Sequence, residues 1–174
     1  MTTSETIYPV QFMRTSVVEV DERTTRQLEA LRSFCIGLRN KIVWAQGSSL
    51  SVIPELQCLK VDRLDKMSAL FTTDHCHVLI EDEFVKISLI YWEPGKLSSI
   101  HGHPSGGCVF KVLSGQLNEM RYTSSQVPVL LATSDYQTNG IGYIHDEMGY
   151  HAVGNSYVKP AYSIHVYSKV NNHN

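Results

Sequence analysis

The feature that most constrains the fold is a series of short strand-like segments that fills the chain from about residue 72 to residue 170. Many of their residues are β-branched or aromatic, and Gly, Pro, Asn or Asp separates each segment from the next. One long run is interrupted at Gly115. The segments are HVLIED, FVKISLIYWEPG, SSIHGHPSGG, CVFKVLSGQLNEMRY, PVLLATSDYQTNG, IGYIHDEMG, YHAVGN and AYSIHVYSKV. Eight or so short strands with such turns predict a mainly β sandwich or barrel.

Residues 21–70 have a different pattern and predict a helical region. Residues 21–45 have apolar side chains at helical spacing, and acidic residues lead into the first turn. The stretch QGSSLSVIPEL is rich in helix-breaking residues and predicts a connection. Residues 57–71, QCLKVDRLDKMSALF, predict a second amphipathic helix. The expected apolar stripes are Leu28, Leu31, Cys35 and Leu38 in the first helix, and Leu59, Leu64, Met67 and Leu70 in the second.

These patterns predict two N-terminal α-helices packed on one small β-barrel. The barrel is expected over residues 72–170, and residues 1–20 are expected to form an extended or irregular arm. A length of 174 residues fits a single domain, 1–174, which can bury a core without disulfides.

The overall charge is small: 15 basic and 17 acidic residues give a net charge of −2, without a long run of either sign. This balance argues against nucleic acid or an anionic membrane as the main partner. No apolar stretch approaches membrane-spanning length, and the first residues lack the pattern of a signal peptide. The four cysteines have no close-paired spacing and are expected to be thiols. We expect a cytoplasmic protein and a monomer.

Two histidines, His101 and His103, stand two residues apart in one of the strand-like segments. Side chains at i and i+2 share a face of a strand, so both imidazoles are expected to point the same way. They are candidate ligands for iron, nickel, copper or zinc, and a third ligand is needed. His151, at the start of YHAVGN, is the strongest choice, whereas His145 stands beside acids in an expected solvated turn.

Other polar residues can meet this histidine pair if their strands turn the same face inward. Cys108 begins the next strand, and Ser163, His165 and Tyr167 share one face of the last. His165 could hold a ligand or a tyrosine hydroxyl in place. Taken alone, each has a simpler interpretation: Cys108 as a small buried apolar residue, Tyr167 as a barrel aromatic, and each histidine as an ordinary core or surface residue.

Several of these residues match sequence motifs of the cupin superfamily. The first cupin motif is matched by a glycine, five residues, His-x-His, four residues, a key position at 108, six residues and a glycine. The second is matched by His151, followed four residues later by Asn155. Most cupins carry glutamate at the key position, which is Cys108 here. Cysteine at that position, the string SIHVYS and the pattern W-x-x-G-x-x-S-S-I-H-x-H together resemble the cysteine dioxygenase family, over roughly residues 60–169.

The resemblance implies a cupin fold, that is, a double-stranded β-helix or jelly-roll barrel. It implies that His101, His103 and His151 hold one Fe(II) ion. It also implies a thioether crosslink between Cys108 and Tyr167. Ser163, His165 and Tyr167 would form a hydrogen-bonded relay that places the tyrosine hydroxyl near oxygen. The implied reaction adds both atoms of O2 to a thiol sulfur and gives a sulfinate.

Metal chemistry agrees with this implied reaction. Three neutral imidazoles leave a divalent metal with its full charge, which favours an anionic, soft ligand such as a thiolate. Metal binding also lowers the pKa of a thiol, so that it can bind as thiolate near neutral pH.

The chain departs from the family where cysteine-specific members place an arginine that binds the substrate carboxylate. Counting back from Trp92, this position falls at or near His75, in the stretch FTTDHCHVLIED. A protonated histidine could receive a carboxylate, although it is a weaker and less planar partner than arginine. Cys76 and His77 could also occupy this position, and HCH could simply be a turn that leads into a strand. The identity of the thiol therefore stays open.

Three functions remain from the sequence. The first is an Fe(II)-dependent thiol dioxygenase that acts on cysteine or another small thiol together with O2. The second keeps the iron but oxidises a different cysteine-derived molecule. The third is a non-catalytic cupin that binds a metal or a ligand. Retention of the relay residues together with Cys108 favours the first.

Overall fold

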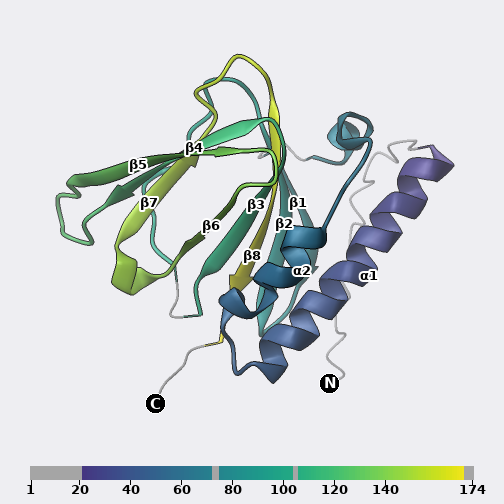
Figure 1. Ribbon diagram of the computed structural model, residues 1–174, viewed down its shortest axis with the longest axis horizontal. Coiled ribbons are helices and arrows are strands. Elements are labelled where there is room, and N and C mark those ends of the chain that lie inside the picture. The colour runs from purple at the N-terminus through teal and green to yellow at the C-terminus, as the bar shows by residue number, and fades with distance from the viewer. Residues whose placement is uncertain (1–20, 72–74, 104–105, 171–174) are drawn as a thin grey trace, which may run out of the picture.

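The structure is a computed structural model that describes residues 21–71, 75–103 and 106–170. The predicted arm at residues 1–20 lies outside the described residues. Eight strands and two α-helices make up the described chain (Figure 1). The helical elements are α1 (Glu22–Trp44), η1 (Ser49–Val52), α2 (Ile53–Cys58), η2 (Leu64–Leu70) and η3 (Asp146–Met148), where η marks a 3-10 helix. The strands are β1 (Cys76–Glu81), β2 (Val85–Trp92), β3 (Cys108–Ser114), β4 (Gln116–Tyr122), β5 (Leu130–Gln137), β6 (Ile141–Ile144), β7 (Tyr150–Gly154) and β8 (Ala161–Ser168).

The strands form two antiparallel sheets, as the short-strand pattern predicts. One sheet has five strands in the order β1-β2-β8-β3-β6, and the other has three in the order β5-β4-β7. Gly115, at φ +82, separates β3 from β4, so the predicted break in that run is confirmed. The fold is the predicted cupin, a mainly β jelly-roll barrel with two N-terminal α-helices.

The segment between β2 and β3 differs from its prediction as a strand. It pairs with β7 only through two isolated bridges, Leu97 with Gly154 and His101 with His151. The glycines of this segment weaken it as a strand, because glycine has no side chain to pack. The result is an extended loop that runs antiparallel to β7, the edge strand of the three-stranded sheet.

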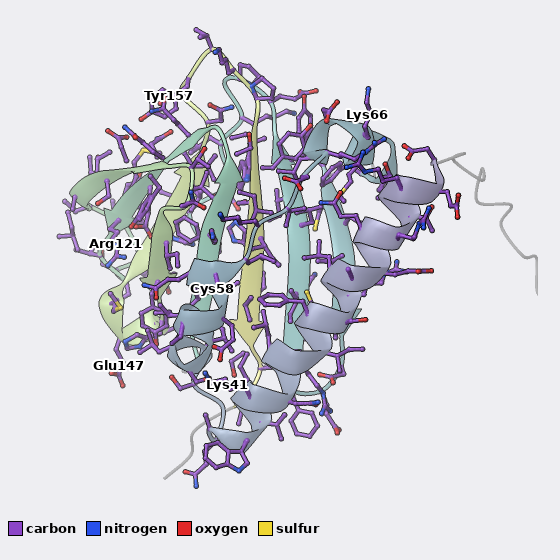
Figure 2. The ribbon with its side chains drawn as sticks, turned by 45° about the vertical axis from the view of Figure 1, so that its right-hand side comes forward. Lys41, Cys58, Lys66, Arg121, Glu147 and Tyr157 are labelled. Atoms are coloured by element: carbon purple, nitrogen blue, oxygen red, sulfur yellow. The ribbon has the colours of Figure 1, made fainter. Side chains whose placement is uncertain are left out.

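Helix α1 has the predicted position and the predicted buried stripe. The carboxylate of Asp21 accepts hydrogen bonds from the backbone N–H groups of Arg23 and Thr24, and so caps its N-terminus. Leu31 and Leu38 are buried against the five-stranded sheet, in a cluster that includes strand residues such as Ile87. Burial of each such leucine contributes about 1.5–3 kcal/mol to folding. In Figure 2, α1 lies across this face of the barrel, with Arg121 on the side away from it.

The position predicted for the second helix is wrong. Helix α2 spans Ile53–Cys58 and begins inside the stretch 46–56 expected to be a connection. After α2 ends, the rest of the predicted range 57–71 holds an irregular segment followed by η2. Pro54 stands in the first turn of α2, where its fixed φ favours a helix and its missing N–H costs nothing. Arg63 has φ 54°, a left-handed conformation that interrupts any helix through it.

A buried lysine joins α2 to the barrel. Lys111 on β3 is fully buried, and its Nζ donates to the carbonyls of Leu56, Gln57 and Leu59 at 2.8, 3.2 and 2.7 Å. These carbonyls lie at the C-terminal end of α2, where no backbone N–H of the helix is available to bond them. Burial lowers the pKa of Lys111, and the three acceptors compensate for its desolvation. The contact fixes α2 against β3.

Candidate metal centre

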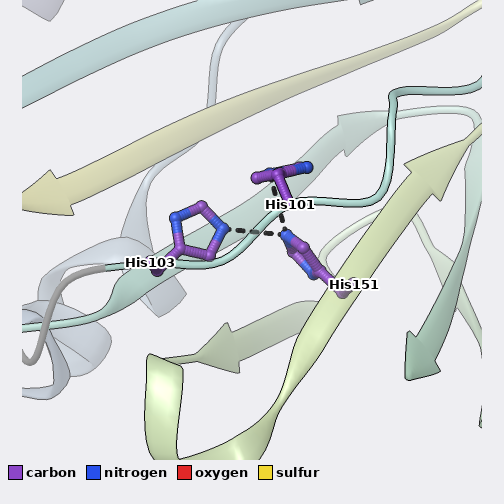
Figure 3. Close-up of side chains that lie close together, drawn as sticks. All are labelled: His101, His103 and His151. Carbon is purple, nitrogen blue, oxygen red and sulfur yellow. Dashed lines mark hydrogen bonds between the residues drawn. The ribbon is translucent and has the colours of Figure 1, made fainter. Parts of the chain in front are cut away.

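Three histidines from two separate segments of the chain lie close together (Figure 3). His101 and His103 come from the loop before β3, and His151 comes from β7. His101 and His151 exchange two backbone hydrogen bonds of 2.9 Å, and the N–H of His103 donates to Asp146 Oδ1 at 2.6 Å. Gly102, between the two loop histidines, leaves no room for a Cβ, which would lie 2.5 Å from Asp146 Oδ1. The local backbone therefore sets the direction of all three rings.

The Nε2 atoms of these rings face one another. His151 Nε2 lies 2.8 Å from His103 Nε2 and 3.2 Å from His101 Nε2, and each residue offers a ligand atom within 4.8 Å of the others. The Nδ1 atom of His101 lies 2.8 Å from the carbonyl oxygen of Ser99, which can only accept, so this Nδ1 carries the hydrogen. Its Nε2 therefore presents a lone pair toward the other rings.

His151 has the same tautomer, because its Nδ1 lies 2.8 Å from the carboxylate of Glu119. Two lone pairs that face each other repel, and a cation between them removes the repulsion. Burial, with the neighbouring histidines, lowers the pKa of His103 to about 3, so the neutral imidazole required for metal binding is favoured. The donor set fits a transition metal, and the fold with this cluster supports a metal cofactor.

Glu119 is a functional candidate that the sequence reasoning missed. It lies on β4 beside β7, is fully buried, and receives hydrogen bonds from His151 Nδ1, Arg121 Nε and the hydroxyl of Tyr136. Burial alone would raise the pKa of Glu119, but the bonds from His151 and Tyr136 and the charge of Arg121 outweigh it, so the pKa is lowered. The carboxylate is thus ionised and holds the ring of His151 in place.

A signal for Glu119 exists in the sequence. Leu117 and Glu119 are two residues apart in QLNEMRY, so they share a face of the strand, and Leu117 is an apolar residue suited to the core. A carboxylate on the buried face of a strand requires a partner. The key cupin position at 108 lacks a carboxylate, and Glu119 supplies one through His151 instead.

The predicted relay residues on β8 form a hydrogen-bonded row. His165 Nε2 lies 2.9 Å from Ser163 Oγ, and His165 Nδ1 lies 3.4 Å from the hydroxyl of Tyr167. The ring of His165 stacks on Phe110, with centroids 5.2 Å apart and a 16° angle between the planes. Burial lowers the pKa of His165 to about 3, so this ring is neutral. The ring of Tyr167 lies 5.4 Å from the ring of His103, which links the row to the histidine cluster.

Trp92 determines the direction in which the hydrogen bonds of this row run. Its Nε1–H donates to Ser163 Oγ at 2.8 Å, and an indole cannot accept in return. Among the described residues the acceptor left for the Ser163 hydroxyl hydrogen is therefore His165 Nε2. The hydrogen of His165 is then on Nδ1, toward the oxygen of Tyr167. The hydroxyl hydrogen of Tyr167 remains free to bond elsewhere.

Cys108 and Tyr167 are directly opposite each other on the neighbouring strands β3 and β8. Cys108 is fully buried, and burial raises the pKa of its thiol. Burial, followed by the neighbouring Cys108, also raises the pKa of Tyr167. Both groups are therefore neutral near pH 7, side by side at the edge of the metal centre.

His75 lies at the wall of a cavity beside the centre. Its φ is +56°, its side chain is 28% exposed, and its Nε2 lies 3.9 Å from Glu93 Oε2. An acidic partner is therefore already close to the residue predicted to bind a substrate carboxylate. His77 points elsewhere, with its Nε2 buried and unpaired among the described residues. His145, the less favoured ligand, contacts the ring of Tyr143 at 5.6 Å and is not part of the cluster.

Fold and site together define a metal-binding cupin with a cluster of three histidines. A family model described as Cysteine dioxygenase type I matches residues 76–172, more than half of the 174 residues. The chain belongs to this family.

Individual relatives agree with this assignment. Cysteine dioxygenase type 1 of Danio rerio is 37% identical over 90 residues, which cover 47% of this chain and 44% of the relative. The Homo sapiens enzyme of the same name is 34% identical over 87 residues, with the same coverage. The chain thus matches less than half the length of these curated relatives.

Two solved structures superpose on part of this chain. A Bacillus halodurans structure superposes with a TM-score of 0.50 and 15% identity, over 62% of this chain and 79% of that one. A Klebsiella pneumoniae protein with a double-stranded β-helix domain has a TM-score of 0.44 and 19% identity, over 57% of this chain and 82% of that one.

No helix in the described ranges is long and apolar enough to cross a membrane.

Proposed function

We propose that this protein is an Fe(II)-dependent thiol dioxygenase that adds both atoms of O2 to the sulfur of a small thiol, cysteine or a cysteine-like molecule, and gives a sulfinate. The observation that carries the proposal is the convergence of three imidazole Nε2 atoms within 4.8 Å, beside the hydroxyl row on β8. Membership of the family supports iron among the metals that imidazole ligands accept.

His101, His103 and His151 would hold the iron, and their neutral rings leave its charge to be balanced by a thiolate. When bound, Fe(II) supplies the redox chemistry of O2 and lowers the pKa of a coordinating thiol. The overall step is balanced without a reductant, because RS⁻ and O2 give RSO2⁻. Glu119 would keep Nε2 of His151 aimed at the metal by fixing the hydrogen on Nδ1.

The relay has a separate role. Trp92, Ser163 and His165 each donate toward the next residue, so the oxygen of Tyr167 accepts and its own hydrogen is available to an anionic or oxygen-bearing ligand in the site. The burial that raises the pKa of Tyr167 keeps this hydrogen in place near neutral pH. The relay would thereby hold one proton at a defined position without providing a base.

The pairing of Cys108 with Tyr167 supports a thioether crosslink between them. Its formation joins the sulfur to a ring carbon, removes one hydrogen from each residue, and passes two electrons to O2. A crosslinked chain runs faster on a denaturing gel. Wild-type protein after turnover should show this faster band, and a Cys108→Ala variant should lack it while it retains iron.

Oxygen uptake tests the proposal. Iron-loaded protein would be mixed with cysteine, 3-mercaptopropionate, cysteamine, mercaptosuccinate or homocysteine, and the products weighed by mass spectrometry. The expected result is uptake with at least one thiol and a product heavier by two oxygen atoms. His101→Ala should abolish it, and His145→Ala, a histidine outside the cluster, should not. Absence of uptake with every thiol, in protein shown to hold iron, would contradict the proposal and favour a non-catalytic cupin or a different oxidation.

A further inference from the structure

A cavity of about 600 Å³ opens beside the metal centre. Its walls come from three segments: His75 and Cys76, Ile90 to Trp92, and Lys96 to Ser99. Two of its lining residues contact residues of the site: Trp92 donates to Ser163 of the relay at 2.8 Å, and the carbonyl oxygen of Ser99 lies 2.8 Å from His101 Nδ1. These contacts place the cavity next to the histidine cluster.

The basic side chains of the cavity lining differ in whether an acidic group lies nearby. The lining carries two basic side chains, His75 and Lys96, and no acidic one. The nearby carboxylate of Glu93 is closest to His75, at 3.9 Å. In the described part of the chain, Lys96 forms no ion pair. The ammonium of Lys96 is therefore the charge in this wall that a ligand is left to neutralise.

Lys96 stands on a rigid turn. Its N–H donates to the carbonyl of Glu93 at 3.1 Å, with Pro94 and Gly95 (φ +81°) at the two central positions, the arrangement of a type II β-turn. Asn155 at the end of β7 bonds both sides of the turn: its carbonyl accepts from Gly95 at 2.7 Å, and its N–H donates to the carbonyl of Lys96 at 2.8 Å. The stem of Lys96 is thus fixed relative to β7, which carries His151.

The position and size of the cavity favour a ligand longer than a single amino acid. His103 and His151 are 4% and 1% exposed, whereas Lys96 lies at the exposed mouth. A volume of about 600 Å³ is typical of pockets for ligands of drug size. Ile90, Tyr91 and Leu97 provide apolar wall between the two ends.

We propose that the cavity is a carboxylate subsite in which Lys96 binds the acidic end of an extended thiol, one whose carboxylate lies further from the sulfur than in cysteine. A dipeptide with an N-terminal cysteine and a free carboxylate has this chemistry. The inference rests on the proposed function, since it assigns the sulfur to the metal centre.

The test compares one charge on the protein with one charge on the ligand. Cysteinylglycine and its amide have nearly the same size, but only the first carries a carboxylate. Lys96→Met would be compared with Lys159→Met. Lys159 is also exposed, and its backbone carbonyl accepts a hydrogen bond from the side-chain amide of Asn155. An exposed ion pair predicts a rise in KM of up to about fivefold for the acid in Lys96→Met. The KM of the amide, the kcat of both, and all values in Lys159→Met should stay unchanged.

Binding is measured separately by calorimetry with iron-loaded protein under anaerobic conditions, so that the two proposals can fail independently. A selective loss of cysteinylglycine affinity in Lys96→Met, in a wild-type protein that turns over neither cysteinylglycine nor any thiol of the panel, would retain the subsite and overturn the dioxygenase. Turnover with KM and affinity equal in Lys96→Met and wild type would overturn the subsite and retain the dioxygenase. A rise in KM that is equal for the acid and the amide would also overturn it, because the loss would then be one of packing.

Discussion

The two sides of the histidine cluster are built differently. On the side of β4 and β7, Glu119 and His151 are 0% and 1% exposed, and Arg121 and Tyr136 complete the hydrogen bonds of the carboxylate. On the side of β2 and the turn after it, the wall is an open cavity whose exposed Lys96 has no acidic partner in the described chain. The buried side fixes the ring of His151, a proposed metal ligand, and the open side presents a lysine ammonium for which we propose a ligand carboxylate as the partner.

We therefore expect the buried side to determine the reaction and the open side to determine which thiol binds. Substitutions on the buried side should alter metal affinity and proton position for every substrate. Substitutions on the open side should alter which thiol is preferred. The following predictions test that separation, from the largest expected effect to the smallest.

The largest effect is expected from His151→Ala. It removes one of the three proposed ligand atoms and leaves the buried Oε1 of Glu119 without its donor, while Oε2 keeps its bonds from Arg121 and Tyr136. Iron content, measured by inductively coupled plasma mass spectrometry after desalting, should fall to background, and thiol oxidation with it. A folded His151→Ala protein, by circular dichroism, that keeps stoichiometric iron would refute the ligand assignment.

Tyr167→Phe removes the hydroxyl at the end of the relay and leaves the ligands untouched. Loss of a positioned proton donor should lower kcat about 100-fold at unchanged iron content. Trp92→Phe should have a smaller effect on kcat, because it removes only the bond that orients Ser163. Steady-state kinetics with iron-normalised protein measures both. Equal kcat values for Tyr167→Phe and wild type would contradict a role of the relay in the reaction.

Glu119→Gln tests whether the buried carboxylate acts on the metal through His151. The amide weakens the acceptor for His151 Nδ1 and sets an N–H₂ group against Arg121, so iron affinity should fall about 10- to 100-fold. Competition with a chelator measures it. Tyr136→Phe removes another hydrogen bond of the same carboxylate and is the matched control, with little change expected. If both variants lose the same affinity, the effect is general destabilisation of the network.

The smallest effect is a pH dependence of stability from His165. Its pKa is about 3 in the folded protein, because of burial, against about 6.5 in the unfolded chain. The unfolded chain then binds more protons as the pH falls below about 6.5, so the contribution is complete above that value and is lost progressively below it. One proton corresponds to about 1.4 kcal/mol per pH unit in the free energy of unfolding. Urea titrations at about pH 6 and pH 5 should show a shallower loss in His165→Gln than in wild type, and equal slopes would contradict the buried neutral ring.

The same contrast explains how far the sequence could be read. The short strands and their turn residues were enough to predict the barrel, including the break at Gly115. Burial of one face of a strand imposes a period of two on its sequence. The spacing of His101 and His103 drew attention to the cluster, although their segment is a loop and not a strand. The helical layer was harder to predict, because the short helix α2 depends on Pro54 and on the long-range bonds from Lys111 more than on local periodicity.

Polar contacts between residues far apart in the sequence were also not predicted. Glu119 is 32 residues from His151, and only the pairing of β4 with β7 brings them to 2.8 Å. Lys96 is exposed, and the sequence analysis assigned it no role. Its interest comes from a cavity whose walls are distant in the chain. Sequence patterns show which face of an element is buried, but not which charges share a space.

The most direct test of the central claim is oxidation of the preferred thiol under ¹⁸O₂ by iron-loaded protein, with mass spectrometry of the sulfinate. The account predicts that both oxygen atoms of the new sulfinate carry the label, and that His101→Ala protein forms no product. Incorporation of one labelled atom, or of none, would show that water supplies oxygen to the product and would contradict a dioxygenase at this centre.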